Sequence, residues 1–276
     1  MTAIMFPGQG SQRTGMGKEL FLKYNNIIEQ ANDVLGYSIE ELYNDKERLN
    51  LTQYTQPAVY IVNSLAWMDA KENYKADFFL GHSLGEYNAL LAAEVIDFAT
   101  GLQIVIERAN IMSHVAGGMA AIIGLDYESI KKQLESNNIN CEIANYNSNK
   151  QVVISGPNVD IENCFSLFHK ESCKFIKLNV SGPFHSKLMQ PYVEDYYKFL
   201  NRFLFNPPKV PIILNRTARA SIDSLDIKKD LAEQLSYPVL WKQSIEYLLC
   251  LQETHFQEVG IGHTLTNLVN EIINDN

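Results

Sequence analysis

The 276-residue chain is poor in cysteine, in clustered basic residues and in long apolar runs, and each shortage excludes a class of protein. Its four cysteines show no CxxC spacing and no histidine partner at zinc-ligand intervals, so they predict neither a metal site nor a disulfide framework. A formal charge of −9 without a basic run argues against binding to nucleic acid or to an anionic membrane surface. No apolar run approaches the ~20 residues that cross a bilayer.

The N-terminal sequence MTAIMFPGQG has neither the basic segment nor the apolar segment of a secretory signal. Together with the scarcity of cysteine, this predicts a cytoplasmic protein. The composition, 46% hydrophobic, is that of an ordinary globular protein, and the length allows a large domain that carries a smaller one.

Short apolar runs alternate with longer helical patterns along most of the chain. The runs at residues 3–6, 77–80 and 210–214 predict strands. Helical spacing of apolar residues predicts helices at 56–70, 84–95, 98–114, 186–203, 227–235, 241–249 and 264–273. This alternation favours an α/β domain built around a parallel sheet.

A different pattern begins at Gly117 and Gly118. It predicts a strand at 119–125, a helix at 127–136, strands at 141–144 and 151–155, a helix at 160–169 and a strand at 174–180. The βαββαβ order is typical of a ferredoxin-like subdomain. We therefore expect a large α/β domain from residues 1–117 and 183–276, and an inserted ferredoxin-like subdomain from residues 118–182.

The most informative motif is GHSLG at residues 81–85, placed between a predicted strand and a predicted helix. In this context the motif predicts a nucleophile elbow, a tight turn that presents Ser83 at the end of the sheet. The helix that follows offers unpaired N–H groups to a developing oxyanion. The alternative is a glycine-rich turn with an incidental serine.

A serine nucleophile needs a general base, and six histidines are available. The side chain of His82 is expected to point away from that of its neighbour Ser83, and His169 lies on a predicted amphipathic helix. His185 follows the point where the chain re-enters the large domain, and ligand sites favour such junctions, so His185 is the candidate base. No single carboxylate stands out as the third member, but a backbone carbonyl can also orient an imidazole.

Two further features place polar groups where a ligand could use them. The loop of Gly8, Gln9 and Gly10 follows the first strand and fits neither a dinucleotide fingerprint nor a phosphate-binding loop. It predicts a backbone that approaches a ligand and presents donors, or only a tight turn. Arg108 lies on a helix that is otherwise apolar on one face, and Glu107 is wrongly spaced to pair with it. Arg108 is therefore a candidate clamp for a substrate carboxylate, with a structural pairing as the alternative.

Taken together, these segments resemble the malonyl-CoA:acyl-carrier-protein transacylase family, which includes free-standing acyltransferases that serve polyketide synthases. The resemblance covers nearly the whole chain. Its collinear segments are FPGQGSQ (6–12), GHSLGEY (81–87), Arg108, MAAIIG (119–124), ANYNS (144–148), PFHS (183–186), QL (234–235), YPV (237–239) and EVG (258–260).

The resemblance implies an α/β-hydrolase-like large domain with a ferredoxin-like insert, and it implies a role for each matched residue. Ser83 is the acylated nucleophile and His185 its base, oriented by the main-chain carbonyl of Gln234. Backbone N–H groups of Gln9 and Leu84 form the oxyanion hole. The pocket side chains implied are Arg108, which pairs with the malonyl carboxylate, together with Gln56, Met112, Asn147 and Phe184.

The implied reaction moves malonyl from malonyl-CoA to the phosphopantetheine thiol of an acyl carrier protein, through a malonyl ester of Ser83. Malonyl-CoA is then a substrate, no cofactor or metal is permanently bound, and the enzyme is expected to be a monomer. The GPFH sequence around His185 slightly favours polyketide over fatty-acid synthesis. The alternatives are an acyl hydrolase of the same family, whose members tend to lack the arginine, a non-catalytic docking subunit and a generic esterase.

The charge raises one further question, because acyl carrier proteins are typically acidic and repel an acidic enzyme. Residues 126–187 hold seven lysines and seven acidic residues, so the negative charge lies outside the insert. We therefore expect the carrier protein to dock on the insert, steered by Lys170, Lys174 and Lys177.

Overall fold

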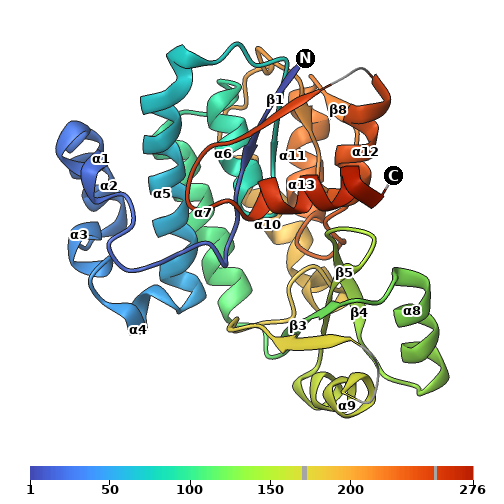
Figure 1. Cartoon of the computed structure of the whole chain (residues 1–276). Coiled ribbons are helices and arrows are strands. Elements are labelled where there is room, and N and C mark those ends of the chain that lie inside the picture. The colour runs from blue at the N-terminus through green and yellow to red at the C-terminus, as the bar shows by residue number, and fades with distance from the viewer. Residues whose placement is uncertain (170–172, 252–253, 276) are drawn as a thin grey trace.

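The structure is a computed structural model that describes residues 1–169, 173–251 and 254–275. A five-stranded sheet forms the centre of the larger part (Figure 1). Its strands, in the order β8-β7-β2-β1-β9, are Ala220–Ser221, Ile212–Ile213, Phe78–Gly81, Thr2–Phe6 and His255–Glu258. All pairs are parallel except β7 with β8, which confirms the predicted α/β domain with a parallel sheet.

Alternate residues of β1 explain how helices cover both faces of this sheet. Ala3 and Met5 pack in a cluster with α12 (Trp241–Leu251) and α13 (Thr264–Asp275). Ile4 and Phe6 point the other way, into the main core with α5 (Thr52–Ala70) and α7 (Phe98–Ser113). The result is a three-layer arrangement of helices, sheet and helices.

Four N-terminal helices lie outside these layers and were not predicted. They pack at the edge formed by α5 and α7 (Figure 1). Side chains cap two of them, because Ser38 and Asp45 accept hydrogen bonds from backbone N–H groups in the first turns of α3 and α4. The four are α1 (Lys18–Lys23), α2 (Asn25–Leu35), α3 (Ile39–Leu42) and α4 (Lys46–Leu49).

The smaller part is an antiparallel sheet of β3 (Gly118–Ile123), β4 (Glu142–Tyr146), β5 (Gln151–Gly156) and β6 (Lys174–Lys177). The strand order is β4-β5-β3-β6. Helices α8 (Tyr127–Ser136) and α9 (Asn158–Phe168) pack on one face through a separate hydrophobic cluster. The predicted order of two helices and four strands is therefore present.

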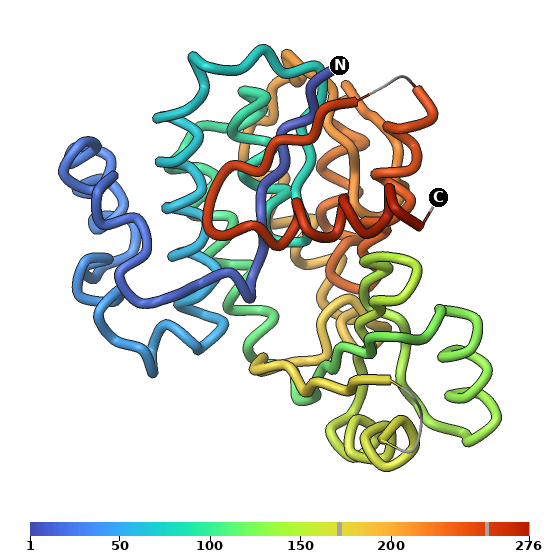
Figure 2. Tube along the Cα trace, in the orientation of Figure 1, coloured from blue at the N-terminus to red at the C-terminus, as the bar shows by residue number. Residues whose placement is uncertain are grey.

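The other face of the small sheet turns toward the large part. Met119 and Ala121 of β3 belong to the main core, whereas Ala120 and Ile122 face α8 and α9. Val239 ties the two parts together, because its N–H donates to the carbonyl of Ala144 (2.8 Å) and its carbonyl accepts from the N–H of Tyr146 (2.9 Å). The chain trace in Figure 2 shows the small part projecting below the large one.

Two predicted helices have different bounds in the structure. Helix α5 begins at Thr52 rather than residue 56, so Pro57 lies inside it. The ring of Pro57 leaves only the carbonyl of Gln53 without its helical donor, and Gln53 is exposed to water. The helix expected at 186–203 is a 3-10 segment, η2 (Lys187–Tyr192), followed by α10 (Val193–Leu200), since Pro191 cannot donate within a regular helix.

The remaining elements are η1 (Lys71–Asn73), α6 (Gly85–Ala92) and α11 (Ser224–Glu233). In the described ranges, no helix has both the length and the apolar character needed to cross a membrane. The four cysteines, all of which lie in the described ranges, form no disulfide bond.

Candidate active site

Ser83 lies in a strained turn between β2 and α6. Its backbone has a φ of 51°, the left-handed region that most residues avoid. Only glycine fits on either side, since a Cβ at Gly81 would lie 1.9 Å from the backbone of Gly85, and one at Gly85 would lie 2.0 Å from the carbonyl oxygen of Phe6. The GHSLG motif thus forms the predicted sharp turn from strand to helix.

Asn215 supports this turn from the next strand of the sheet, just beyond β7. Its Oδ1 accepts a hydrogen bond from the N–H of Ser83 (2.7 Å), and its Nδ2 donates to the carbonyl of Gly81 (2.6 Å). Asn215 was not predicted as a site residue. The available signal was a polar side chain directly after a buried strand, at the same sheet edge as the motif.

Ser83 and His185 form a hydrogen-bonded pair, with 2.7 Å between Oγ and Nε2. His185 Nδ1 lies 2.7 Å from the carbonyl oxygen of Gln234. A carbonyl oxygen can only accept, so Nδ1 carries the proton and Nε2 is left to accept from the hydroxyl of Ser83. The histidine is therefore in the tautomer that a general base requires.

The surroundings of His185 keep its ring neutral. Burial, and then the positive charge of Arg108, lower the pKa of His185 to about 3. The hydrogen bond to Gln234 opposes this shift but does not overcome it. At neutral pH the imidazole is consequently free of its second proton and ready to accept one.

Arg108 reaches the same hydroxyl from α7 and is 1% exposed. Its Nη2 donates to Ser83 Oγ (3.0 Å) and to Gln234 Oε1 (2.9 Å), and its Nη1 donates to Gln56 Oε1 (2.8 Å). Within the described part of the chain it has no carboxylate at ion-pair distance. A buried guanidinium held only by neutral partners can take an anionic ligand.

A cavity of about 240 Å³ opens onto these groups, between the large part and the small sheet. The small sheet contributes Ala121, Gln151 and Val153 to its wall. The predicted site side chains that line it are Gln9, Gln56, Ser83, Arg108, Met112, Asn147, Phe184 and His185.

Two backbone N–H groups border the turn without a partner. Those of Gln9 and Leu84 donate to no acceptor among the residues that the structure describes. The loop of Gln9 lies against the turn, since a Cβ on Gly8 would be 2.4 Å from the carbonyl oxygen of His82. Leu84 directly precedes α6, where helix geometry leaves N–H groups free.

His82 points away from the Ser83 hydroxyl. Its Nε2 lies 2.8 Å from Asn147 Oδ1, and its ring packs beside Trp241 with 5.5 Å between centroids. His82 therefore links the turn to the small sheet.

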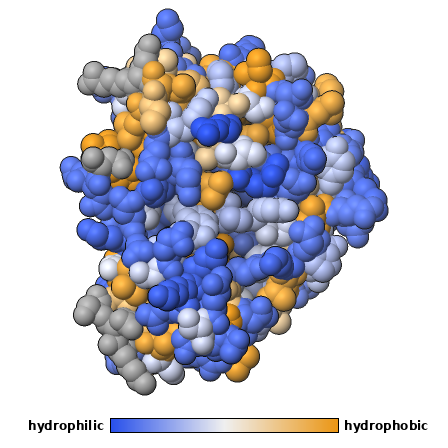
Figure 3. Space-filling view, turned by 90° about the vertical axis from the view of Figure 1, so that its right-hand side faces the viewer, coloured by the Kyte–Doolittle hydropathy of each residue, from blue (hydrophilic) through white to orange (hydrophobic). Residues whose placement is uncertain are grey.

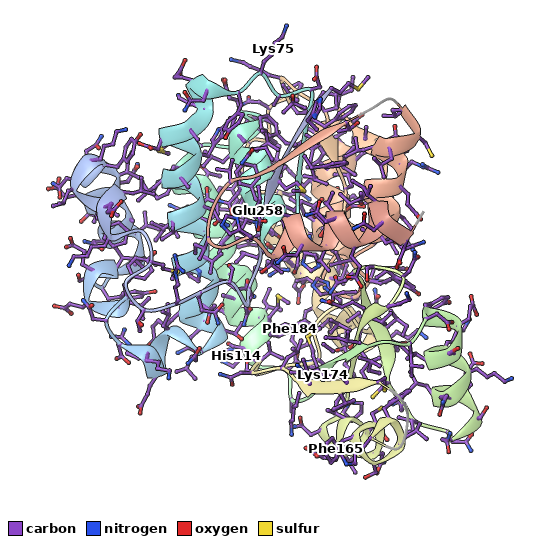
Figure 4. The ribbon with its side chains drawn as sticks, in the orientation of Figure 1. Lys75, His114, Phe165, Lys174, Phe184 and Glu258 are labelled. Atoms are coloured by element: carbon purple, nitrogen blue, oxygen red, sulfur yellow. The ribbon has the colours of Figure 1, made fainter. Side chains whose placement is uncertain are left out.

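The predicted docking lysines occupy different positions. Lys177 extends to the helix side of the small sheet and forms an ion pair with Glu162 of α9. Lys174 is exposed and is paired in register with Ile123, on the face that carries Ala121 and turns toward the cavity. Figure 4 shows Lys174 between Phe184, at the junction, and Phe165, at the far end of the small part. Lys170 lies outside the described residues.

An α/β chain that presents a neutral Ser–His pair at the carboxyl edge of its parallel sheet has the architecture of a serine-dependent acyl-group enzyme. Comparison with known proteins agrees, because residues 4–267 match the acyl transferase domain family. The polyketide biosynthesis malonyl CoA-acyl carrier protein transacylase PksC of Bacillus subtilis is 44% identical, over 100% of this chain and 98% of PksC. The chain belongs to the malonyl CoA-acyl carrier protein transacylase family.

Solved structures give the same result. The crystal structure of malonyl CoA-acyl carrier protein transacylase from Burkholderia pseudomallei is 41% identical with a TM-score of 0.97, covering 100% of this chain and 99% of that one. A second structure holds PlMCAT, a malonyl-transacylase, in complex with the type II PKS acyl-carrier protein AntF. It is 33% identical with a TM-score of 0.93, covering 99% of this chain and 93% of that one.

Proposed function

We propose that this enzyme transfers malonyl from malonyl-CoA to the phosphopantetheine thiol of an acyl carrier protein, through a malonyl ester of Ser83. One observation carries the proposal. The buried guanidinium of Arg108 lies 3.0 Å from Ser83 Oγ and has no carboxylate partner in the described part of the chain. A substrate whose acyl group ends in a carboxylate supplies that partner.

In the first half-reaction, Ser83 Oγ attacks the thioester carbon of malonyl-CoA while His185 Nε2 takes the hydroxyl proton. The carbonyl oxygen becomes an oxyanion, and the free N–H groups of Gln9 and Leu84 donate to it. When the C–S bond breaks, CoA leaves as its thiol with the proton that His185 returns. The malonyl group is then esterified to Ser83.

The second half-reaction reverses the first with a different thiol. His185 takes the proton of the phosphopantetheine thiol, and the sulfur attacks the ester carbon of malonyl-Ser83. The C–O bond breaks, and His185 returns the proton to Ser83 Oγ. Malonyl leaves as the thioester of the carrier protein, and the enzyme is restored.

Arg108 selects the acyl group in this proposal. Malonyl places its free carboxylate on the guanidinium, whereas acetyl leaves the charge without a partner, and unpaired buried polar groups produce strong discrimination. Gln56 holds Arg108 at 2.8 Å, and Met112 lies beside Gln56 with 3.4 Å between Sδ and Nε2. Asn147 and Phe184 complete the proposed malonyl pocket.

We also propose the finer domain description. The strand order β4-β5-β3-β6, with both helices on one face, supports a ferredoxin-like subdomain at residues 118–182. The turn at Ser83 supports an α/β-hydrolase-like large domain at residues 1–117 and 183–276.

The carrier protein is proposed to dock on the small subdomain. Lys174 supports this, because it is exposed on the cavity side of the sheet. Lys177 adds less charge, since Glu162 pairs with it. PlMCAT, solved with its acyl-carrier protein, supports a partner of this type.

Pathway, assembly and location are proposed on separate grounds. The identity to PksC, a polyketide biosynthesis protein, supports polyketide synthesis. A monomer is supported by the face in Figure 3, where hydrophilic side chains cover most of the surface and hydrophobic ones are scattered. The cytoplasm is the proposed location, because the low cysteine content of the sequence favours a reducing compartment.

Intact mass spectrometry after incubation with malonyl-CoA tests the proposed function. The wild type is expected to gain one malonyl group, and Ser83→Ala is expected to gain none. A malonyl adduct of equal yield on Ser83→Ala would overturn the proposal, because the acyl group would then sit on another residue.

A further inference from the structure

Glu86 is a fully buried carboxylate in the first turn of α6, three residues after Ser83. Its two oxygens have different partners. Oε1 accepts a hydrogen bond from the backbone N–H of Asn215 (3.1 Å), and Oε2 accepts from the side-chain Nε2 of Gln234. Neither the catalytic pair nor the pocket wall includes this residue, so its burial needs a separate explanation.

The bond through Oε1 leads to the turn that holds Ser83. Asn215 accepts from the N–H of Ser83 at 2.7 Å and donates to the carbonyl of Gly81 at 2.6 Å. Glu86 therefore holds in place the residue, Asn215, that supports the strained turn at Ser83.

The bond through Oε2 leads to Arg108 by way of the Gln234 amide. The Nε2 of Gln234 faces Glu86, and therefore its Oε1 faces Arg108 and accepts from Nη2 at 2.9 Å. The carboxylate, together with the carbonyl of Ser83 that also accepts from Nε2 (3.2 Å), thus sets which end of the amide the guanidinium meets. If the amide were reversed, the Nε2 of Gln234 would face the Nη2 of Arg108, and both groups are donors.

We propose that Glu86 is a positioning residue of the malonyl site, which orients the Gln234 amide so that Arg108 stays aimed at Ser83 Oγ. This inference rests on the proposed function, because it assigns Glu86 to the recognition of a substrate carboxylate.

The substitution Glu86→Gln tests the proposal because it keeps the size and replaces one oxygen with an NH2 group. The remaining oxygen can still accept from the N–H of Asn215, which preserves the turn at Ser83. The NH2 group then faces the Nε2 of Gln234, so two donors meet unless the Gln234 amide turns and places its Nε2 toward Arg108. The variant therefore disturbs Arg108 while leaving the Ser–His pair in place.

The measurement is the ratio of kcat/KM for malonyl-CoA to kcat/KM for acetyl-CoA in loading of the enzyme. We expect Glu86→Gln to lower this ratio about tenfold or more, mainly through the KM for malonyl-CoA. Asp230→Asn is the matched control, since Asp230 is also buried and its side chain pairs with Arg216 rather than with Gln234 or Arg108. The N–H of Gln234 donates to the backbone carbonyl of Asp230, and the substitution leaves that bond in place. Its ratio is expected to stay within twofold of the wild type.

A ratio for Glu86→Gln within twofold of the wild type would overturn the proposal, even if both rates fell, because a structural role lowers them together. If Glu86→Gln does not fold, Gln234→Leu replaces it. This variant keeps the backbone carbonyl for His185 and removes the amide, so an unchanged ratio overturns the proposal there too. Absence of malonyl loading by the wild type would instead refute the proposed function itself.

Discussion

At the scale of single residues, Ser83 Oγ takes part in two hydrogen bonds, one as donor and one as acceptor. It donates to the neutral His185 and accepts from the charged Arg108. The same guanidinium that is proposed to bind the malonyl carboxylate also lowers the pKa of His185. Substrate choice and base strength are therefore coupled through one side chain.

Replacement of Arg108 tests its proposed role in substrate choice. We expect Arg108→Ala to lower kcat/KM for malonyl-CoA by roughly 100-fold or more, since losing one partner of a buried charge pair costs about 3–5 kcal/mol. Loading from acetyl-CoA, measured in parallel, is expected to fall far less. Equal losses of kcat/KM for the two substrates would show that Arg108 supports the structure of the site without binding the substrate carboxylate.

The pH dependence of acylation tests the lowered pKa of His185. The reaction needs neutral His185, and a pKa lowered to about 3 keeps that form present as the pH falls, until the pH approaches the pKa itself. The rate of malonyl-Ser83 formation in rapid-quench experiments should thus be flat from neutral pH down to about pH 5. A half-maximal rate near 6.5, the ordinary value for histidine, would contradict the buried environment described here.

At the scale of elements, the turn between β2 and α6 depends on close backbone approach. We expect Gly85→Ala to lower the free energy of unfolding by about 2 kcal/mol or more, because its Cβ would lie 2.0 Å from the carbonyl oxygen of Phe6. Chemical denaturation measures this loss, and malonyl loading should fall with it.

Gly36→Ala provides the matched control. Gly36 ends α2 with a φ of 73°, and the space around its Cβ position is open. Alanine there should cost about 1 kcal/mol from backbone strain and leave loading intact. A Gly85→Ala enzyme as stable and active as this control would argue against the described turn.

Elements with strong local patterns could be predicted from the sequence. The continuous apolar run of β1 reflects burial on both faces of the sheet, and the helical spacing of α7 and α13 reflects one buried face, so both patterns can be found in the sequence. The helices α1, α3 and α4 were missed because they span only four to six residues each, so no long apolar period develops in them. Helix α2 spans eleven residues but buries only Ile28 and Ala31, and it was missed as well. The prediction placed Pro57 in the first turn of its helix, although α5 begins at Thr52. The helix expected at 186–203 ignored Pro191, where the structure has the 3-10 segment η2.

The site was predictable only where its residues lie in a motif. Ser83 and its glycines occupy one short stretch. His185 and Arg108 were candidates from their places in the chain, and the remaining roles relied on a resemblance. Glu86 and Asn215 received no role, since the bond between them joins positions 129 residues apart. Such contacts arise from the order of β2 and β7 in the sheet, which local sequence does not encode.

At the scale of the whole molecule, charge is the basis for the proposed encounter with the carrier protein. We expect Lys174→Glu to raise the KM for the carrier protein about threefold to tenfold at low salt, with the effect shrinking as salt screens it. Steady-state transfer at two salt concentrations measures this. Loading from malonyl-CoA should change little, because Lys174 does not line the cavity.

Lys75→Glu makes the same charge change at the opposite end of the molecule (Figure 4). It should leave the KM for the carrier protein near the wild-type value. If both variants raise it equally, net charge rather than a docking surface governs the encounter.

The central claim is that Ser83 carries malonyl from one thiol to another. Its most direct test mixes isolated malonyl-enzyme with a phosphopantetheinylated carrier protein and follows both masses in a single turnover. We predict that the malonyl mass leaves the enzyme and appears on the carrier protein at the same rate. Release of free malonate with an unmodified carrier protein would contradict the account and identify an acyl hydrolase.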